Sequence, residues 1–125
     1  MRDRRALITG ASRGIGAAVA RGLAEDGFPV ILAYQSREAD ALAVKAQIEA
    51  AGGEARLTRF DVTDGEAAGR AIEELLASDG RPIGVVVNNA GLASDAPFPS
   101  MTREQWTSVT RTTLDGFYNV THPLV

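Results

Sequence analysis

The fold is decided by the stretch Ala6-Leu7-Ile8-Thr9-Gly10-Ala11-Ser12-Arg13-Gly14-Ile15-Gly16. Its first three residues are apolar, as is typical of a short buried strand. Three glycines follow in the pattern Gly-x-x-x-Gly-x-Gly, and a helix is predicted to begin at Gly14 or Ile15. Glycine lacks a Cβ, so such a turn brings its backbone close to a ligand. The first N–H groups of a helix have no partner within it, and the stretch therefore predicts a site for a phosphate group.

A strand followed by a helix recurs four times along the chain. The strands are predicted within residues 5–9, 28–34, 55–62 and 83–88. The helices are predicted within residues 14–26, 38–51, 64–78 and 102–118. The residues predicted to cap the last three helices are Ser36, then Thr63 or Asp64, then Ser100 or Thr102. The second strand is continuously apolar, which fits a strand covered on both faces, and the fourth strand is also expected to be fully buried. This alternation predicts an α/β fold, a parallel sheet with helices on both faces.

Composition limits the class of protein. The 125 residues suit a single domain, and 45 % of them are hydrophobic, which is enough for a core. A net charge of −3 without a long basic run argues against nucleic acid as the main partner. No stretch approaches the ~18 apolar residues of a membrane span, and the charged residues 1–5 do not begin a signal peptide. The absence of cysteine suits a cytoplasmic protein.

Polar residues and glycines gather where the predicted strands end. These ends are Thr9 and Gly10, then Tyr34, then Asp61 and Val62, then residues 88–91, Asn-Asn-Ala-Gly. In an open parallel sheet, ligands bind at the carboxyl ends of the strands, where the strand order reverses. The sequence therefore places its binding site at this edge of the sheet.

Three motifs together resemble the short-chain dehydrogenase/reductase family. They are Thr9-Gly10-x-x-x-Gly14-x-Gly16, the acid Asp61 closing the third strand, and the run Asn88-Asn89-Ala90-Gly91 after the fourth. The turn motif and residues 33–37, Ala-Tyr-Gln-Ser-Arg, are most similar to those of β-ketoacyl-[acyl carrier protein] reductases. The resemblance implies a Rossmann-type doubly wound parallel sheet, of which this chain supplies the first four strands and their helices.

The resemblance also implies which residues contact a dinucleotide cofactor. The residues expected along the pyrophosphate are Gly10, Ser12, Gly14, Ile15 and Gly16. The residues expected at the adenine and its ribose are Asp61, Val62, Asn89, Ala90 and Gly91. Two alternatives stay open, since Asp61 also suits a turn aspartate and Asn88 suits a tie between strands. The loop residues Ser94 and Asp95 are expected to border the substrate.

The end of the second strand points to NADP as the cofactor. An NAD site carries Asp or Glu there to bind the ribose hydroxyls, whereas this sequence has Tyr34. Arg13 and Arg37 are expected to reach the 2′-phosphate of NADP, with Ser36 adding a hydroxyl. The alternative is that Arg37 is only a solvated residue at the start of a helix.

The family's proton-transfer residues are missing. The family uses a serine and a Tyr-x-x-x-Lys pair, in which the lysine lowers the pKa of the tyrosine. Here the single lysine is Lys45, and neither tyrosine has a lysine four residues later. Thr113 stands where many members carry a catalytic asparagine, and His122 has no visible partner. No residue is assigned a catalytic or metal-binding role, and the chain is expected to end before the catalytic region.

Two functions follow from these observations. The first is an NADP-dependent reductase of a carbonyl, such as a 3-oxoacyl-[acyl carrier protein] or a similar β-ketoacyl thioester, whose first 125 residues are inactive alone. The second is that the 125-residue chain is a non-catalytic dinucleotide-binding or assembly fragment, because it lacks the Tyr-x-x-x-Lys pair. A homodimer or homotetramer is expected for the longer protein. Trp106 and Phe117 suit either that contact or burial against the chain's own sheet.

Overall fold

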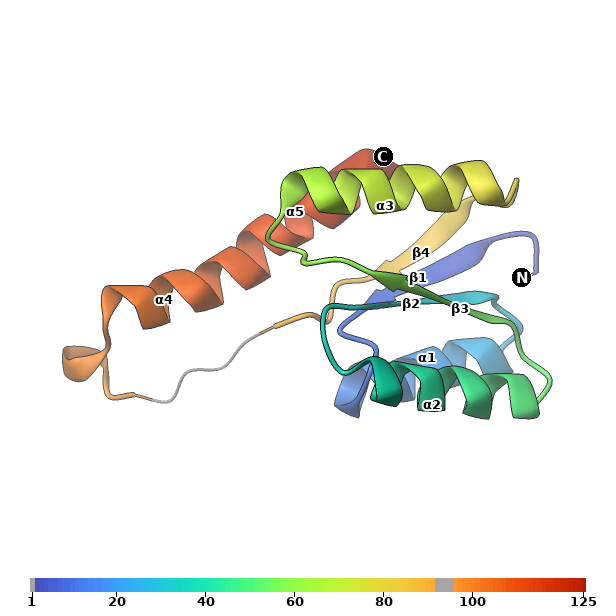
Figure 1. Cartoon of the computed structure of the whole chain (residues 1–125), viewed down its shortest axis with the longest axis horizontal. Coiled ribbons are helices and arrows are strands. Elements are labelled where there is room, and N and C mark those ends of the chain that lie inside the picture. The colour runs from blue at the N-terminus through green and yellow to red at the C-terminus, as the bar shows by residue number, and fades with distance from the viewer. Residues whose placement is uncertain (1, 92–95) are drawn as a thin grey trace.

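The computed structural model describes residues 2–91 and 96–125. Four parallel strands form one sheet in the order β3-β2-β1-β4 (Figure 1). Their bounds are β1 Arg5–Thr9, β2 Val30–Tyr34, β3 Ala55–Arg59 and β4 Ile83–Val87. In register, Ile8 of β1 lies level with Leu32 of β2 and with Val87 of β4. The chain runs outward from β1 to β3 and then returns to the other side of β1, so the order reverses between β1 and β4.

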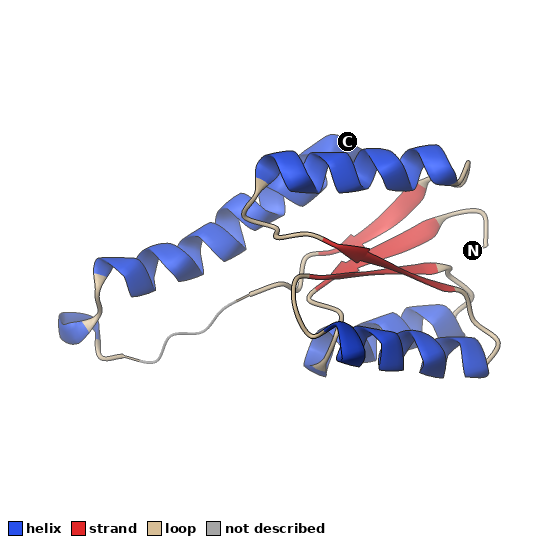
Figure 2. Ribbon diagram, in the orientation of Figure 1, coloured by secondary structure: helices blue, strands red, loops and turns tan. Residues whose placement is uncertain are grey.

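Helices cover both faces of the sheet, as the alternation predicts (Figure 2). Helices α1 (Gly14–Glu25) and α2 (Glu38–Ala50) pack on one face, where Ala17, Ala20, Val44 and Ile48 meet the apolar side chains of β1 and β2. Helices α3 (Gly65–Ser78) and α5 (Gly116–Thr121) pack on the other face, through Ala68, Ile72, Leu75 and Val120. The fold class expected from the sequence is confirmed.

Three local expectations are wrong. The second strand begins at Val30 rather than Phe28. Ser36 does not cap α2, because Arg37 takes that position with a left-handed backbone (φ 58°) and makes no capping hydrogen bond through its side chain. Strand β4 is only partly buried, because it pairs with β1 on one side and forms the edge of the described sheet. Two capping predictions are confirmed. Asp64, rather than Thr63, caps the helix that begins at Gly65, and Thr102, rather than Ser100, caps the helix that begins at Arg103.

The last predicted helix is divided into three segments. A capping box between Thr102 and Gln105 begins α4 (Arg103–Thr110), a π-helical turn spans Arg111–Asp115, and α5 follows. Figure 1 shows α4 extending away from the sheet. Trp106 and Phe117 are 50 % and 56 % exposed, so neither is buried against the chain's own sheet.

A buried arginine closes the other edge of the sheet, where the strands begin. Arg5 is only 2 % exposed, and its guanidinium donates to the carbonyl oxygens of Leu75 (2.9 Å), Arg81 (2.7 and 3.0 Å) and Asp79 (3.4 Å). Beside it, the Arg81 side chain bridges the carboxylates of Asp79 (2.6 Å) and Glu54 (2.8 Å). These contacts join the end of α3 to the starts of β1, β3 and β4.

The Asp79 carboxylate makes stability sensitive to acid. The Arg81 guanidinium and then the Arg81 backbone N–H hold the pKa of Asp79 well below its ordinary value of 3.8. Below about pH 4 the unfolded chain therefore binds more protons than the folded chain, and the free energy of unfolding falls with pH. We expect an Asp79→Asn variant to show a shallower fall in urea unfolding between about pH 4 and pH 2 than the wild type. Parallel curves for the two proteins would contradict this account.

Candidate functional site

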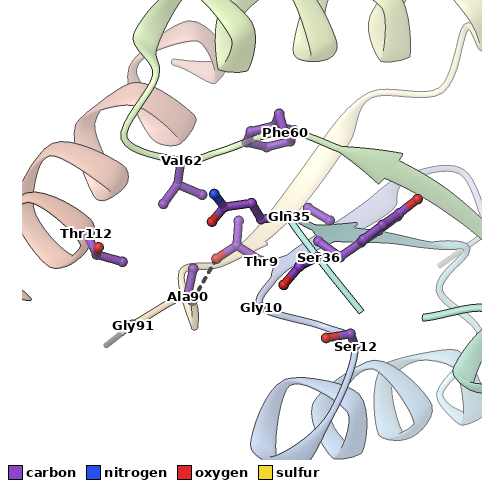
Figure 3. Close-up of a pocket in the computed structure, with 12 residues that line it drawn as sticks. Thr9, Gly10, Ser12, Gln35, Ser36, Phe60, Val62, Ala90, Gly91 and Thr112 are labelled. Carbon is purple, nitrogen blue, oxygen red and sulfur yellow. Dashed lines mark hydrogen bonds between the residues drawn. The ribbon is translucent and has the colours of Figure 1, made fainter. Parts of the chain in front are cut away.

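A cavity of about 190 Å³ lies at the carboxyl ends of the strands (Figure 3). It is bounded by the turn after β1, the ends of β2 and β3, the segment after β4 and the π-helical turn. The residues that line it are Thr9, Gly10, Ser12, Ala33, Tyr34, Gln35, Ser36, Phe60, Val62, Ala90, Gly91 and Thr112. It is therefore where the sequence placed the binding site, beside the reversal of strand order.

The glycine turn packs tightly against the chain that follows β4. At Gly16 a Cβ would lie 2.2 Å from the Gly10 carbonyl oxygen and 2.6 Å from Asn89 Nδ2, distances that real side chains do not adopt. The Asn89 amide donates to that same carbonyl at 3.1 Å. Thr9 adds a second tie, because its buried hydroxyl accepts from the backbone N–H groups of Asn89 (3.1 Å) and Ala90 (3.0 Å). Together these bonds fix the width of the cavity between β1 and β4.

The start of α1 is left open for an anion. Helices α2, α3 and α4 each carry an acidic residue in their first turn, whereas α1 carries none and has no capping side chain. The helix dipole places partial positive charge at this end, and its first N–H groups have no partner within the helix. Ser12, just before the helix, lines the cavity. The arrangement suits a phosphate group.

At the end of β2, a tyrosine is paired with an acid that the sequence reasoning missed. Tyr34 is 7 % exposed, and its hydroxyl donates to Glu38 Oε1 at 3.1 Å. Burial, and then the Glu38 carboxylate, raise the pKa of Tyr34. Arg37 is exposed and lies 3.5 Å from Asp40, and Arg13 is also exposed. Neither arginine lines the cavity, although each directly follows a serine that does.

The Asp61 carboxylate is engaged within its own turn. Its Oδ1 accepts from the backbone N–H and the hydroxyl of Thr63, at 2.9 and 2.8 Å, and its Oδ2 accepts from Gln35 Nε2 at 3.3 Å. This is the turn aspartate that the sequence left open as an alternative. Val62, the next residue, lines the cavity.

Comparison with known proteins places the chain in a family. The family model described as short chain dehydrogenase matches residues 4–125. The chain belongs to the short-chain dehydrogenase family.

Two curated relatives carry reductase names. The chain is 44 % identical over 119 residues to a 3-oxoacyl-[acyl-carrier-protein] reductase of Aggregatibacter actinomycetemcomitans, covering 95 % of this chain and 49 % of the relative. It is 41 % identical over 122 residues to an acetoacetyl-CoA reductase of Shinella zoogloeoides, covering 98 % and 48 %. The chain thus spans about half the length of the curated relatives it matches.

Solved short-chain dehydrogenases have the same architecture. A metagenomic short-chain oxidoreductase in complex with NADP matches with a TM-score of 0.89 and 35 % identity, over 98 % of this chain and 55 % of that one. A short-chain dehydrogenase of Burkholderia cenocepacia J2315 in complex with NADP matches with a TM-score of 0.89 and 32 % identity, over 98 % and 49 %. The Rossmann-type fold is thereby shown.

Within this short-chain dehydrogenase, the structure brings half of the expected cofactor residues to the cavity wall. Those lining it are Gly10, Ser12, Tyr34, Ser36, Val62, Ala90 and Gly91. The expected residues outside that lining are Arg13, Gly14, Ile15, Gly16, Arg37, Asp61 and Asn89. Ile15 is 75 % exposed, whereas Asn89 is turned to the Gly10 carbonyl. Ser94 and Asp95 lie outside the described residues.

Five lining residues were not among the expected cofactor contacts, namely Thr9, Ala33, Gln35, Phe60 and Thr112. Thr9, Ala33 and Gln35 lie within the motifs quoted from the sequence, and Phe60 directly precedes Asp61. Thr112 belongs to the π-helical turn, which no pattern in the sequence predicts. Its neighbour Thr113 lines a small adjoining cleft of about 40 Å³.

Two kinds of feature are absent from the described part of the chain. Among residues 2–91 and 96–125, no group of three or more histidine, cysteine, aspartate or glutamate side chains is placed to hold a metal ion. None of the described helices is long and apolar enough to cross a bilayer.

Proposed function

We propose that this chain binds NADP in the cavity at the carboxyl ends of its strands. The observation that carries the proposal is the cavity itself, bounded by the glycine turn, by Tyr34 to Ser36 and by Ala90 and Gly91. Ligand pockets usually measure about 300–1,000 Å³, so a cavity of this size suits one part of the dinucleotide. The open start of α1 would then take the pyrophosphate. The NADP bound to two solved relatives supports the choice of cofactor.

We infer that the pyrophosphate lies along the turn and the nucleoside against the ends of β3 and β4. The turn residues are Gly10, Ser12, Gly14, Ile15 and Gly16, and those near the nucleoside are Asp61, Val62, Asn89, Ala90 and Gly91. Asp61 still has lone pairs free on Oδ2, whereas Asn89 acts through the Gly10 carbonyl that it holds. The reduced cofactor would supply a hydride, and the residues of this chain would hold and orient the cofactor.

Selectivity for the 2′-phosphate is assigned to Arg13 and Arg37, with Ser36. An Arg13→Ala variant should bind NADPH about tenfold to a hundredfold more weakly, because a hydrogen bond to a charged group contributes about 1.5–3 kcal/mol. Its affinity for NADH should be unchanged. Arg21→Ala is the matched control, since Arg21 is exposed on α1, the helix that Arg13 precedes, and donates to Gln47 Oε1 at 3.2 Å. Calorimetric titration measures both, and an equal loss for the two nucleotides would contradict the assignment.

The substrate of the longer protein is proposed to be a β-ketoacyl thioester, carried on acyl carrier protein or on coenzyme A. The names of the curated relatives support this class. The described site offers no Tyr-x-x-x-Lys pair, and Lys45 lies on α2, so the 125 residues should not oxidise NADPH alone. A chain extended to the length of the relatives should oxidise NADPH with acetoacetyl thioesters. Absence of turnover with any carbonyl compound would contradict the reductase.

A second candidate is a non-catalytic dinucleotide-binding or assembly protein, which the missing pair favours. NADPH binding without turnover by the extended chain would select it. A cytoplasmic location, the absence of a nucleic-acid or membrane partner, and a homodimer or homotetramer also stay predictions. The exposure of Trp106 and Phe117 supports a contact with another subunit.

A further inference from the structure

Helix α5 is joined directly to the wall of the cavity. Asn119 Nδ2 donates to the Val62 carbonyl oxygen at 2.9 Å, across 57 residues of sequence. The same side chain rests against the start of α3, where a Cβ on Gly65 would lie 3.1 Å from Asn119 Oδ1. The Asn119 amide therefore links α5 to the segment between β3 and α3 and to the beginning of α3.

The backbone of α5 also touches the Val62 side chain. A Cβ placed on the buried Gly116 would lie 2.8 Å from Val62 Cγ2, so only glycine allows this approach. Val62 is thus held at two points, by its carbonyl and by its side chain. Figure 3 shows Val62 facing the cavity between the helical segment that carries Thr112 and the side chain of Gln35.

A second bond links α5 to the opposite side of the cavity. Asn88 Nδ2 donates to Thr121 Oγ1 at 3.0 Å, and Ala90, two residues after Asn88, lines the cavity. The turn that precedes α5 contributes Thr112 to the same wall. One helix of six residues therefore fixes the relative positions of the wall at Val62 and the wall at Ala90.

We propose that Asn119 is a positioning residue for the nucleoside half of the dinucleotide, an inference that rests on the proposed NADP site. It acts through Val62 and does not touch the ligand. Without the amide donor, the Val62 carbonyl turns to water. The segment before α3 is then held by the Asp61–Thr63 and Asp61–Gln35 bonds, by the Asp64 cap and by the packing of Val62 on Gly116, and it loses its hydrogen bond to α5. Ligand binding must then order this segment, and the conformational entropy lost in doing so weakens the binding free energy.

The test compares Asn119→Asp, which keeps the shape of the side chain but replaces the donor, with the wild type. We expect the affinities for NADPH, NADH and adenosine 2′,5′-bisphosphate to fall by the same factor, about three- to tenfold. The equal loss distinguishes Asn119 from Arg13, whose loss concerns only the 2′-phosphate. Gln105→Ala is the matched control, because it removes an amide–backbone bond of 2.8 Å at the start of α4, away from the cavity.

Each outcome has one meaning. Lower thermal stability of folded Asn119→Asp with unchanged dissociation constants would overturn the positioning role and leave a structural one. If the wild type binds none of the three nucleotides, the proposed function fails instead. If Asn119→Asp does not fold, Asn119→Ser, which carries a smaller polar side chain, provides the same comparison. Dissociation constants equal to those of the wild type would again overturn the inference.

Discussion

A Gly16→Ala variant is expected to lose most of its affinity for NADPH and to unfold more readily than the wild type. The new methyl group has no room, because it would meet the Gly10 carbonyl oxygen at 2.2 Å and Asn89 Nδ2 at 2.6 Å. The turn must move away from the segment after β4, and the bond between Asn89 and Gly10 must lengthen or break. Overpacking of this kind destabilises proteins by about 1–3 kcal/mol.

The matched control for Gly16 is Gly22, in the same helix. A Cβ at Gly22 would meet nothing within 4 Å. Gly22→Ala should therefore stabilise the protein by about 0.5–1 kcal/mol, since alanine favours helix over glycine, and should bind NADPH as the wild type does. Urea unfolding and calorimetry measure both quantities. Normal NADPH affinity in folded Gly16→Ala would contradict the role given to the turn.

The largest loss of stability is expected for Arg5→Met, at about 3–5 kcal/mol. The substitution preserves much of the apolar stem but leaves three carbonyl oxygens without their donor: the buried one of Leu75 and the part-buried ones of Asp79 and Arg81. Each unsatisfied buried polar group costs about 1–3 kcal/mol. Burial, the main influence, lowers the pKa of Arg5, but no accessible pH removes the charge of an arginine.

Arg56→Met provides the comparison for Arg5. Arg56 is exposed, and among the described residues its guanidinium donates a hydrogen bond to the Ser78 hydroxyl. Its loss should change the free energy of unfolding by less than about 0.5 kcal/mol. Equal effects of the two substitutions in denaturant titrations would show that the buried network at the strand starts does not hold the fold together.

Local patterns were enough to predict the architecture and the edge of the sheet at which the cavity lies. The glycine turn, the apolar strands and the strand–helix alternation each depend on residues that are close in sequence. The carboxyl ends of parallel strands lie at one edge of the sheet, so Tyr34, Val62 and Ala90 come together by topology alone.

What the sequence did not reveal depends on contacts between distant residues. Thr112 reaches the cavity only because the helix widens into a π-helical turn, and Asp61 turns to Thr63 and Gln35 in a geometry that its spacing does not specify. Arg5 was predicted only as the first residue of a strand, yet its three carbonyl acceptors lie 70 to 76 residues away in the sequence. The burial of β4 was overestimated because an apolar strand has the same sequence at an edge as in the centre.

The most direct test of the central claim is calorimetric titration of this 125-residue chain with NADPH and NADH. We expect one NADPH to bind per chain, at least about tenfold more tightly than NADH because of the charge of the 2′-phosphate. Absence of binding by either nucleotide, or tighter binding of NADH, would contradict it.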